Sequence, residues 1–436
     1  MAQESGRPRR LLALRPVDHR ARRGASRDLH PADDVQRPPE PPLHRGALLH
    51  DRPQPRASRH HLQEGRKPEQ LQLRPLARGG VGRGAEARGR QVARVLRGAW
   101  RASPDAAELA DLGEAAPLLL RGGSGGLAWW RARRLTGSDS ILEPLHQAFR
   151  LHALQAALHE QKIPAAVTRL RERGIEPVLG KGWAVARLYP RPGLRPYGDV
   201  DLYVGPEAAA AARRALQAPP APGAAVDLHG GFAELDDRPP AELFARSQVA
   251  ALRDCAVRVF GPEDHLRLLA LHFMRHGAWR PVWLCDLALL LEARPLEFDW
   301  GYFVAGDASR TEAAVVALRL AHELLGARVG GLPAPLEKRV LPGWLVPAVL
   351  RQWGQADFAP HGTRTPMAAE LRRPWGLLRA LRMRWPNPVE ATVGRRGRFD
   401  DRPRLPFQIR ECLSRTLQFV RAPGDAAPGP ERAAER

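Results

Sequence analysis

Residues 174–204 read GIEPVLGKGWAVARLYPRPGLRPYGDVDLYV, and this stretch carries the strongest indication of the fold. The run Glu176–Leu179 has the length of a short buried strand and leads into the turn Gly180-Lys181-Gly182. A helix is expected over 183–189, then a loop rich in proline and glycine, and a second strand over Asp199–Val204. This alternation of short strands and helices predicts an α/β (α+β) core with a short mixed sheet.

The pattern continues on both sides of this stretch. Downstream, an alanine-rich helix over 206–217 starts with proline in its first turn, and a third short strand is expected over 224–229. Further helices are expected over 262–276, 283–293, 312–325 and 341–353, which together predict a mainly helical C-terminal extension. Upstream, two separate helices are expected, over 141–158 and 165–173. In the first of them, the apolar side chains are expected mostly on one side: Leu142, Leu145, Phe149, Leu151, Leu154 and Leu158.

The N-terminal segment, residues 1–90, has a different composition. Residues 1–140 contain no Ile, Phe, Tyr or Cys, and Arg, Pro, Gly, His and Ala dominate up to about residue 90. Such a segment cannot bury enough apolar surface to offset its conformational entropy, so we expect it to be disordered. It is either a basic arm that binds nucleic acid or, as we favour, not natural coding sequence. The tail, residues 422–436, is also expected to be disordered.

Charge and cysteine content restrict the class of protein. The formal net charge is +21, but residues 1–100 alone hold 22 basic and 10 acidic residues, so the excess gives little support for nucleic-acid binding by the folded part. Three cysteines in no paired or metal-type spacing fit a reducing compartment. No stretch approaches the roughly 20 apolar residues of a membrane span, and the N-terminus has no signal-peptide pattern. We expect a soluble, cytoplasmic protein without membrane contact.

Two carboxylates stand two residues apart at the start of the second strand. Residues at this spacing in a strand face the same side, so Asp199 and Asp201 would lie side by side and repel each other unless a cation neutralises them. Mg²⁺ or Mn²⁺ suits such oxygen ligands. Asp227 on the third strand would complete a site for two metal ions about 3.5–4 Å apart, which suits phosphoryl chemistry.

The turn Gly180-Lys181-Gly182 is the expected phosphate-binding element. Glycine lets backbone N–H groups approach a phosphate, and the start of a helix favours anions. Lys181 is one of four lysines in a chain with 64 arginines, which is suggestive of a specific task.

The stretch 178–204, followed by VDLHG at 226–230, resembles a family of bacterial uncharacterised nucleotidyltransferases within the polymerase-beta-like superfamily. The resemblance extends over roughly residues 141–330 and includes LLALHFMRHGAWRPVWLCDLALLL. It implies a divalent metal, a nucleoside triphosphate and an acceptor that the sequence leaves unknown (a small molecule, a sugar or a protein). It implies Asp199 and Asp201 as metal ligands, and Asp227 as a third ligand and possible base. Gly180, Lys181, Gly182 and Arg195 would bind the nucleotide.

The sequence also departs from this pattern. The wider superfamily has Gly-Ser at the phosphate turn where this chain has Lys181-Gly182, and the span between Asp201 and Asp227 is short. Glu234 and Asp236 are therefore alternative third carboxylates. A rival interpretation is a catalytically inactive relative that only binds a nucleotide or a partner protein.

Three histidines share one stripe of the helix expected over 262–276. His265, His272 and His276 are spaced by seven and four residues, and with Asp286 they would suit a metal-dependent hydrolase. We favour a structural role at the interface between the helical and catalytic parts, because no accompanying His-Glu motif is present.

These expectations divide the chain into five parts. They are a disordered basic segment (1–90), a helical lead-in (91–175), a nucleotidyltransferase core (176–260), a helical extension (261–421) and a disordered tail (422–436). The expected function is metal-dependent transfer of a nucleoside monophosphate from the triphosphate to the acceptor.

Overall fold

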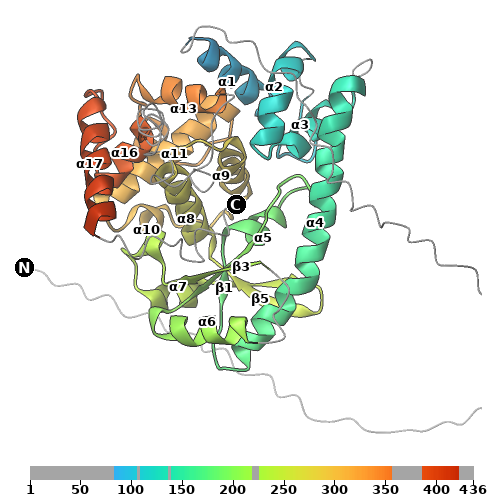
Figure 1. Ribbon diagram of the computed structural model, residues 1–436, viewed down its shortest axis with the longest axis vertical. Helices are drawn as coiled ribbons and strands as arrows, with labels where there is room; N and C mark the ends of the chain where they lie inside the picture. Colours follow the sequence, from blue (N-terminus) through green and yellow to red (C-terminus); the bar gives the residue numbers. More distant parts are fainter. Residues whose placement is uncertain (1–82, 106–108, 136–138, 219–224, 356–384, 422–436) are drawn as a thin grey trace, which may run out of the picture. The chain divides into compact units, whose positions relative to one another are not determined.

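The computed structural model describes residues 83–105, 109–135, 139–218, 225–355 and 385–421 (Figure 1). The segment 1–82 and the tail 422–436, both expected to be disordered, lie outside the described residues. The first helix, α1 (Arg83–Leu96), begins inside the segment that was expected to end at residue 90. All described elements fall within one folded unit, Leu71–Arg436.

A five-stranded mixed sheet has the strand order β3-β2-β1-β5-β4. The strands are β1 (Val178–Leu179), β2 (Val200–Val204), β3 (Val226–Gly230), β4 (Gln248–Leu252) and β5 (Cys255–Val259). The central strand β1 pairs antiparallel with β2 and parallel with β5. At one edge β3 runs parallel to β2, and at the other β4 runs antiparallel to β5. The expected short mixed sheet is thus confirmed.

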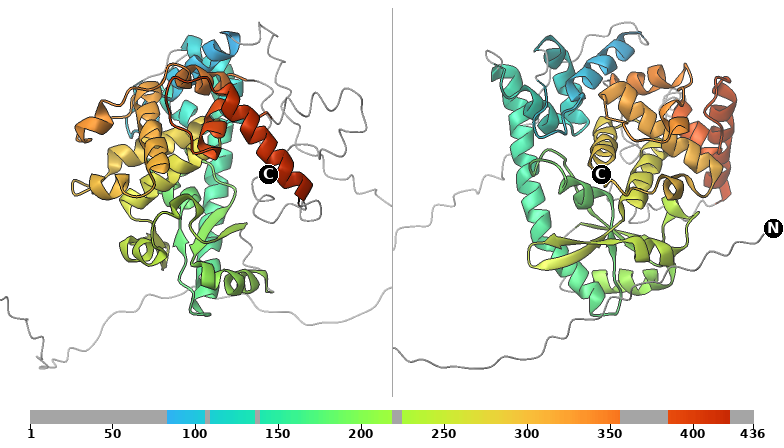
Figure 2. Two further views of the ribbon diagram at one scale, coloured as in Figure 1. Left: turned by 90° about the vertical axis from the view of Figure 1, so that its left-hand side faces the viewer. Right: turned by 180° about the vertical axis from the view of Figure 1, so that it is seen from behind.

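The two faces of this sheet are covered by different helices. Leu202 and Leu228 belong to a core that includes side chains from α4 (Asp139–Arg171) and α6 (Ala209–Gln217). Tyr203 belongs to a second core, shared with α8 (Pro262–Arg275) and α9 (Pro281–Ala293). Because side chains alternate along a strand, the residues next to Leu202 and Leu228 face the α8 side. Figure 2 shows the sheet between these layers.

The helix α4 corrects two sequence-based expectations. It is one helix of 33 residues, not two, and Pro164 lies inside it. An internal proline costs about 3 kcal/mol, but each fully buried large apolar side chain contributes about 1.5–3 kcal/mol, and Ile163, Val167 and Leu170 are all buried next to this proline. The expected apolar stripe is also wrong in its second half. Although α4 contacts α2 (Leu109–Arg121), α3 (Gly125–Ala132) and α6, this half of the stripe leaves three leucines exposed: Leu151, Leu154 and Leu158.

The hairpin β4–β5 and helix α7 (Pro240–Arg246) were not expected from the sequence. The two strands are joined by Arg253 and Asp254, and Arg253 has a left-handed backbone with φ of 54°. Asparagine or glycine usually occupies such a turn, so the arginine at this position gave no sequence signal for a hairpin. The strands add the second edge of the sheet.

The helical extension agrees with the expected helices. It contains α8, α9, α11 (Ala308–Leu325) and α13 (Leu345–Trp353), together with the short helices α10 (Trp300–Val304) and α12 (Ala334–Glu337). After the undescribed residues 356–384 it continues with α16 (Pro388–Gly394) and α17 (Leu405–Arg421). In the described part of the chain, no helix is long and apolar enough to cross a membrane.

The first helix packs against one near the other end of the sequence. In α1, Gly89 lies so close to α13 that a Cβ atom on it would sit 1.9 Å from the carbonyl oxygen of Leu350. A Cβ atom on Gly354, directly after α13, would likewise overlap the carbonyl oxygen of Ala85. This close approach depends on glycine at both positions and fixes α1 onto the helical extension.

Candidate active site

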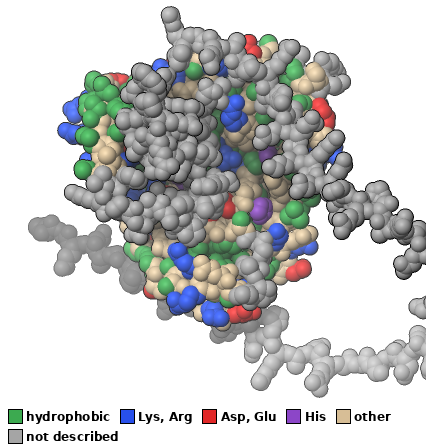
Figure 3. All heavy atoms as spheres, in the orientation of Figure 1, with side chains coloured by type: hydrophobic (Ala, Val, Ile, Leu, Met, Phe, Trp, Pro, Cys, Tyr) green, Lys and Arg blue, Asp and Glu red, His purple; other side chains and the backbone are tan. Residues whose placement is uncertain are grey.

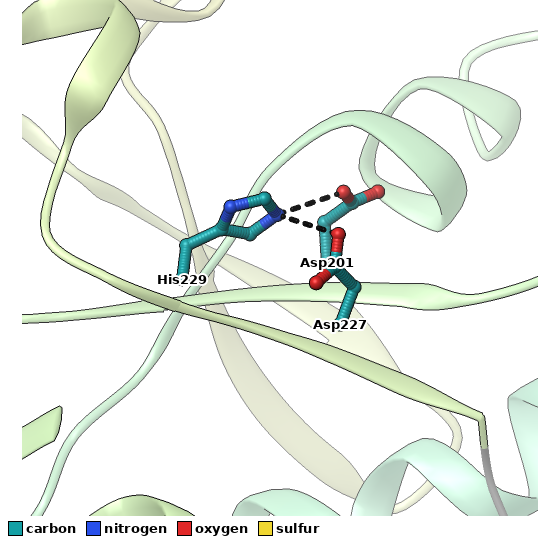
Figure 4. Close-up of side chains that lie close together, drawn as sticks. All are labelled: Asp201, Asp227 and His229. Carbon is teal, nitrogen blue, oxygen red and sulfur yellow. Dashed lines mark hydrogen bonds and ion pairs between the residues drawn. The ribbon is translucent and has the colours of Figure 1, made fainter. Parts of the chain in front are cut away.

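Two strands bring two carboxylates and a histidine together. Asp201 on β2 and Asp227 on β3 are direct partners in the parallel register. His229, two residues beyond Asp227, therefore lies on the same face. Its Nε2 atom is 3.1 Å from Asp201 Oδ1 and 3.1 Å from Asp227 Oδ2, as Figure 4 shows. In the described part of the chain, these are the residues grouped closely enough to share a metal ion.

Lys181 supplies a second positive group to Asp201. Its Nζ atom lies 2.9 Å from Asp201 Oδ1, and both side chains are about nine-tenths buried. Burial opposes a charge on this lysine, yet Asp201 and Glu234 help to raise its pKa well above the ordinary value. Lys181 is therefore charged at neutral pH.

His229 and Asp201 stabilise each other's charged forms. Burial opposes charge on the imidazole, but hydrogen bonds to Asp201 and Asp227 raise the pKa of His229 to about 9. Burial likewise opposes charge on Asp201, but Lys181 and His229 hold the pKa of this carboxyl below its usual range. Tyr203 stacks on the His229 ring at a centroid distance of 4.2 Å and limits its rotation.

Asp199 stands just before β2 and is less buried than Asp201. Burial and the neighbouring charges of Asp201 and Asp227 raise the pKa of Asp199 to about 6. The three carboxylates are thus close enough to repel one another. Asp201 has Lys181 and His229 as partners, so the remaining repulsion appears mainly at Asp199.

The turn 180–182 is shaped by its contacts with the strand that carries the carboxylates. A Cβ atom on Gly180 would lie 2.7 Å from the Tyr203 ring, and one on Gly182 would lie 3.3 Å from Asp201 Oδ2. Lys181 between them has a left-handed backbone with φ of 40°, which directs its side chain onto Asp201. The Gly180 N–H donates to the carbonyl of Asp201 at 3.2 Å.

Arg195 is held by a carboxylate of the helical extension. Its Nε and Nη2 atoms both lie 3.1 Å from Asp286 Oδ2, and the Tyr189 hydroxyl donates to Asp286 Oδ1 at 2.8 Å. All three groups are buried. This network ties the loop before β2 to α9, and it therefore positions Asp199.

Glu234 and Asp236, the alternative third carboxylates, have other partners. Glu234 on η2 (Ala233–Leu235) lies 3.8 Å from His272 Nδ1 and 3.4 Å from Arg275 Nη1. Asp236 is largely exposed and binds Arg310 at 2.6 Å. The structure places Asp227, and neither of these two, opposite Asp201.

The histidines of α8 pack where the helical part meets the sheet. Burial and nearby positive charges lower the pKa of His265 to about 3, and burial and the Lys181 charge help to lower that of His272 to about 4. His272 and His276 both pack edge-on against Trp283. Within the described residues these histidines and Asp286 do not form a set of metal ligands.

Sequence reasoning missed His229 as a site residue. The signal was present. Asp227 and His229 are two residues apart in the expected third strand, as Asp199 and Asp201 are in the second, so each pair is expected on one face of the sheet. The surface around the middle of the face drawn in Figure 3 combines histidine, acidic and basic side chains.

Comparison with known families identifies this region. Residues 125–219 and 220–326 both match the model of a family described as uncharacterised nucleotidyltransferase. The matched part of the chain is similar to this nucleotidyltransferase family. The match includes Lys181, all three aspartates, His229 and the helices α8 to α11. No curated protein and no solved structure matches the chain significantly.

Proposed function

We propose that the chain transfers a nucleoside monophosphate from a nucleoside triphosphate to an acceptor in a metal-dependent reaction. The observation that carries this proposal is the register of Asp201 and Asp227 on parallel strands, within the segment that matches the nucleotidyltransferase family. Asp199 adds a third carboxylate at the same end of β2.

The residues present fit a divalent cation. Asp201 and Asp227 offer oxygen atoms close together. Hydrogen bonds to both carboxylates raise the pKa of His229 to about 9, so its nitrogen would bind Mn²⁺ only after losing a proton. The raised pKa of Asp199, caused by burial and two neighbouring carboxylates, shows that negative charge is in excess there. Asp199, Asp201 and Asp227 would hold the ion. When bound, it would supply positive charge that neutralises the triphosphate.

In the proposed reaction an oxygen of the acceptor attacks the α-phosphorus of the triphosphate. The bond from this phosphorus to the bridging oxygen of the β-phosphate breaks, and pyrophosphate leaves. Asp227 would orient the acceptor and take the proton that its hydroxyl loses. The turn 180–182 would face the triphosphate, and Lys181 would exchange part of its contact with Asp201 for a phosphate oxygen. Arg195, buried on Asp286, would position Asp199 and would not meet the nucleotide.

A catalytically inactive binding module is the second candidate. One observation favours it: Asp201 is already neutralised by Lys181 and His229 without a metal ion. A protein with that arrangement can keep its fold and bind a nucleotide without turning it over.

Two measurements separate these functions. Triphosphate binding is titrated in the presence of Mg²⁺ or Mn²⁺, and pyrophosphate release is followed with a labelled triphosphate and candidate acceptors, including the protein itself. Binding with release that disappears in Asp199→Ala supports the transferase. Binding without release supports the inactive module. If the protein binds no triphosphate, both proposals are wrong.

The role of Lys181 is tested in the same titration. Loss of one charge-assisted contact to phosphate costs about 1.5–3 kcal/mol, so Lys181→Ala should weaken triphosphate binding about ten- to a hundredfold. Lys181→Arg should restore it only in part, because a planar guanidinium does not replace a compact ammonium. Lys162→Ala, at an exposed lysine of α4, is the matched control. Unchanged affinity in Lys181→Ala would show that this lysine serves Asp201 alone.

A further inference from the structure

A cavity of about 270 Å³ lies between η2, α8, α11 and the residues that follow α16. These elements are far apart in the sequence, but α8 contacts η2, α11 and α16. Leu271 and Phe399 form part of an apolar wall, and Arg275, Arg310 and Arg396 supply three guanidinium groups. Apolar walls with a few converging polar groups are typical of small-molecule sites.

Two of these arginines are available to a ligand. The side chains of Arg275 and Arg396 are 59% and 71% exposed. Each has a long contact with one carboxylate, Arg275 with Glu234 at 3.4 Å and Arg396 with Asp307 at 3.8 Å. The Arg396–Asp307 pair is largely exposed and contributes little to stability, so the Arg396 guanidinium can turn toward an anion at small cost. Glu234 is buried, so Arg275 would meet the anion while it keeps its contact with this carboxylate.

The third arginine forms the frame of the cavity. Arg310 Nη1 donates to the carbonyl oxygens of Ala233 and Glu234 at 3.1 Å and 2.7 Å. Its Nη2 atom is 2.6 Å from Asp236 Oδ1. Arg310 therefore fixes η2 against α11 and leaves ligand binding to Arg275 and Arg396.

The backbone at Arg396 is unusual for its residue type. Its φ of 49° lies in the left-handed region, which glycine and asparagine adopt more easily than arginine. The structure thus keeps a charged side chain at the edge of the cavity where a smaller residue would relieve strain. This conformation belongs to the C-terminal cap of α16, where the N–H groups of Arg396 and Gly397 donate to the carbonyls of Val393 and Thr392 at 3.0 Å and 2.8 Å, so the cap fixes Arg396 at the edge of the cavity.

Glu234 connects the cavity with the candidate active site. Its side chain lines the cavity, and its charge helps to raise the pKa of Lys181. The contact with His272 and the ion pair with Arg275 hold this carboxylate in place between the two sites. A ligand in the cavity would therefore lie next to the catalytic residues but would bind through different groups.

We propose that this cavity is a second ligand site, for a small molecule that carries a carboxylate or phosphate group on an apolar body. The anionic group lies between Arg275 and Arg396, and the apolar body packs against Leu271 and Phe399. The site goes beyond the proposed nucleotidyl transfer, because none of these four side chains belongs to the metal or triphosphate site.

The test uses three probes of similar size: phenyl phosphate, benzoate and the neutral benzyl alcohol. Binding to the full chain is measured by titration at moderate salt. We expect saturable binding of at least one anion and at least tenfold weaker binding of benzyl alcohol. The two anionic probes distinguish a phosphate ligand from a carboxylate ligand.

Three variants locate the binding. Arg396→Asn removes the charge but suits the left-handed backbone, and it should weaken the anion about tenfold while keeping the melting temperature. Arg275→Gln combined with Arg396→Asn should weaken it further. Val393→Phe fills the cavity from a partly exposed position and should also reduce binding. The control Arg213→Gln with Arg214→Gln removes the same charge from the exposed side of α6 and should bind as the unmodified protein does.

Three outcomes would overturn the proposal. One is that neither anion binds. Another is that both cavity variants, Arg396→Asn and Val393→Phe, bind like the unmodified protein. The third is an equal loss in the α6 control, which would show attraction to net charge and not to this cavity. None of these outcomes depends on triphosphate binding, so the proposal fails or stands separately from the proposed function.

Discussion

At the scale of single residues, Asp199 and Asp201 differ although the sequence presents them as a matched pair. Asp201 is buried and contacts Lys181 and His229, whereas Asp199 is partly exposed and repelled by its neighbours. Removing Asp201 leaves Lys181 as a buried cation without its partner, and breaking such a pair costs about 3–5 kcal/mol. Removing Asp199 relieves repulsion instead.

We therefore expect different results from the two alanine variants. Both should abolish metal-dependent turnover, but only Asp201→Ala should lower the free energy of unfolding of the metal-free protein, by about 3–5 kcal/mol. Asp199→Ala should change it by less than about 1 kcal/mol. Denaturant unfolding in the presence of a chelator measures both values. The double variant Lys181→Met with Asp201→Ala should recover part of the loss, and equal losses in Asp199→Ala and Asp201→Ala would contradict the assigned contacts.

His265 provides a prediction about pH. Burial and the guanidinium groups of Arg187 and Arg195 lower its pKa from 6.5 to about 3, and its Nε2 atom has no hydrogen-bond partner in the described structure. Between these pH values the unfolded chain binds more protons than the folded one. Stability contributed by neutral His265 is therefore complete above about pH 6.5 and decreases as the pH falls toward 3, by at most about 1.4 kcal/mol per pH unit.

Replacement of this histidine should make the protein more tolerant of acid. We expect His265→Leu to be as stable as the unmodified protein at pH 7.5 or more so, and to lose less free energy of unfolding between pH 7 and 5. Denaturant unfolding at several pH values measures the difference. His322→Leu, at a histidine of α11 that is only partly buried, is the control. Parallel stability curves for His265→Leu and the unmodified protein would show that this residue does not titrate as described.

The candidate site was partly predictable from residue spacing. Asp199, Asp201 and Asp227 follow from strand periodicity, and the structure brings their side chains close enough to interact. The partners that determine their charges were not predictable, because they depend on tertiary contacts. Lys181 reaches Asp201 through a strained turn, and Arg195 is bound to Asp286, 91 residues away.

At the scale of elements, local signals predicted three of the five strands and the main helices of the extension. Apolar periodicity and helix start signals predict the bounds of four helices to within a few residues: α8, α9, α11 and α13. In contrast, β1 has two residues and is a strand only because β2 and β5 pair with it. Pro164 is typical of a helix boundary, but burial on both sides of it keeps α4 continuous.

The packing of α1 on α13 gives a prediction at this scale. A methyl group on Gly89 cannot fit beside the Leu350 carbonyl, so Gly89→Ala should push the helices apart and cost about 1–3 kcal/mol or more. Gly84, in the same helix, has only the flexible end of Arg88 nearby, at 3.5 Å. Gly84→Ala should therefore be neutral or stabilise the helix by up to about 1 kcal/mol. Thermal unfolding compares the two, and equal effects would contradict this packing.

At the scale of the whole molecule, the family match and the hydrophobic core have different limits. The match spans residues 125–326, whereas the main core also contains Val92, Leu96 and Trp100 before it and Leu350 and Trp353 after it. Helices therefore extend the core at both ends of the matched region, and α1 and α13 pack on each other. The family region alone would expose the apolar surfaces that α1 and α13 cover.

This arrangement fixes where the chain can be shortened. Deletion of residues 1–82 removes a segment whose Arg-, Pro- and Gly-rich composition cannot form a core, so it should leave the melting temperature and any triphosphate binding unchanged. Deletion of residues 1–96 also removes α1 with its buried Val92, Val95 and Leu96. Each such side chain contributes about 1.5–3 kcal/mol, and their sum approaches the 5–15 kcal/mol that typically stabilises a domain. The longer deletion should therefore unfold at a much lower temperature or fail to fold. Deletion of 1–90, which ends inside α1, should lie between the two. If removing residues 1–82 is as damaging as removing 1–96, the first part of the chain contributes to the fold in a way that its composition does not indicate.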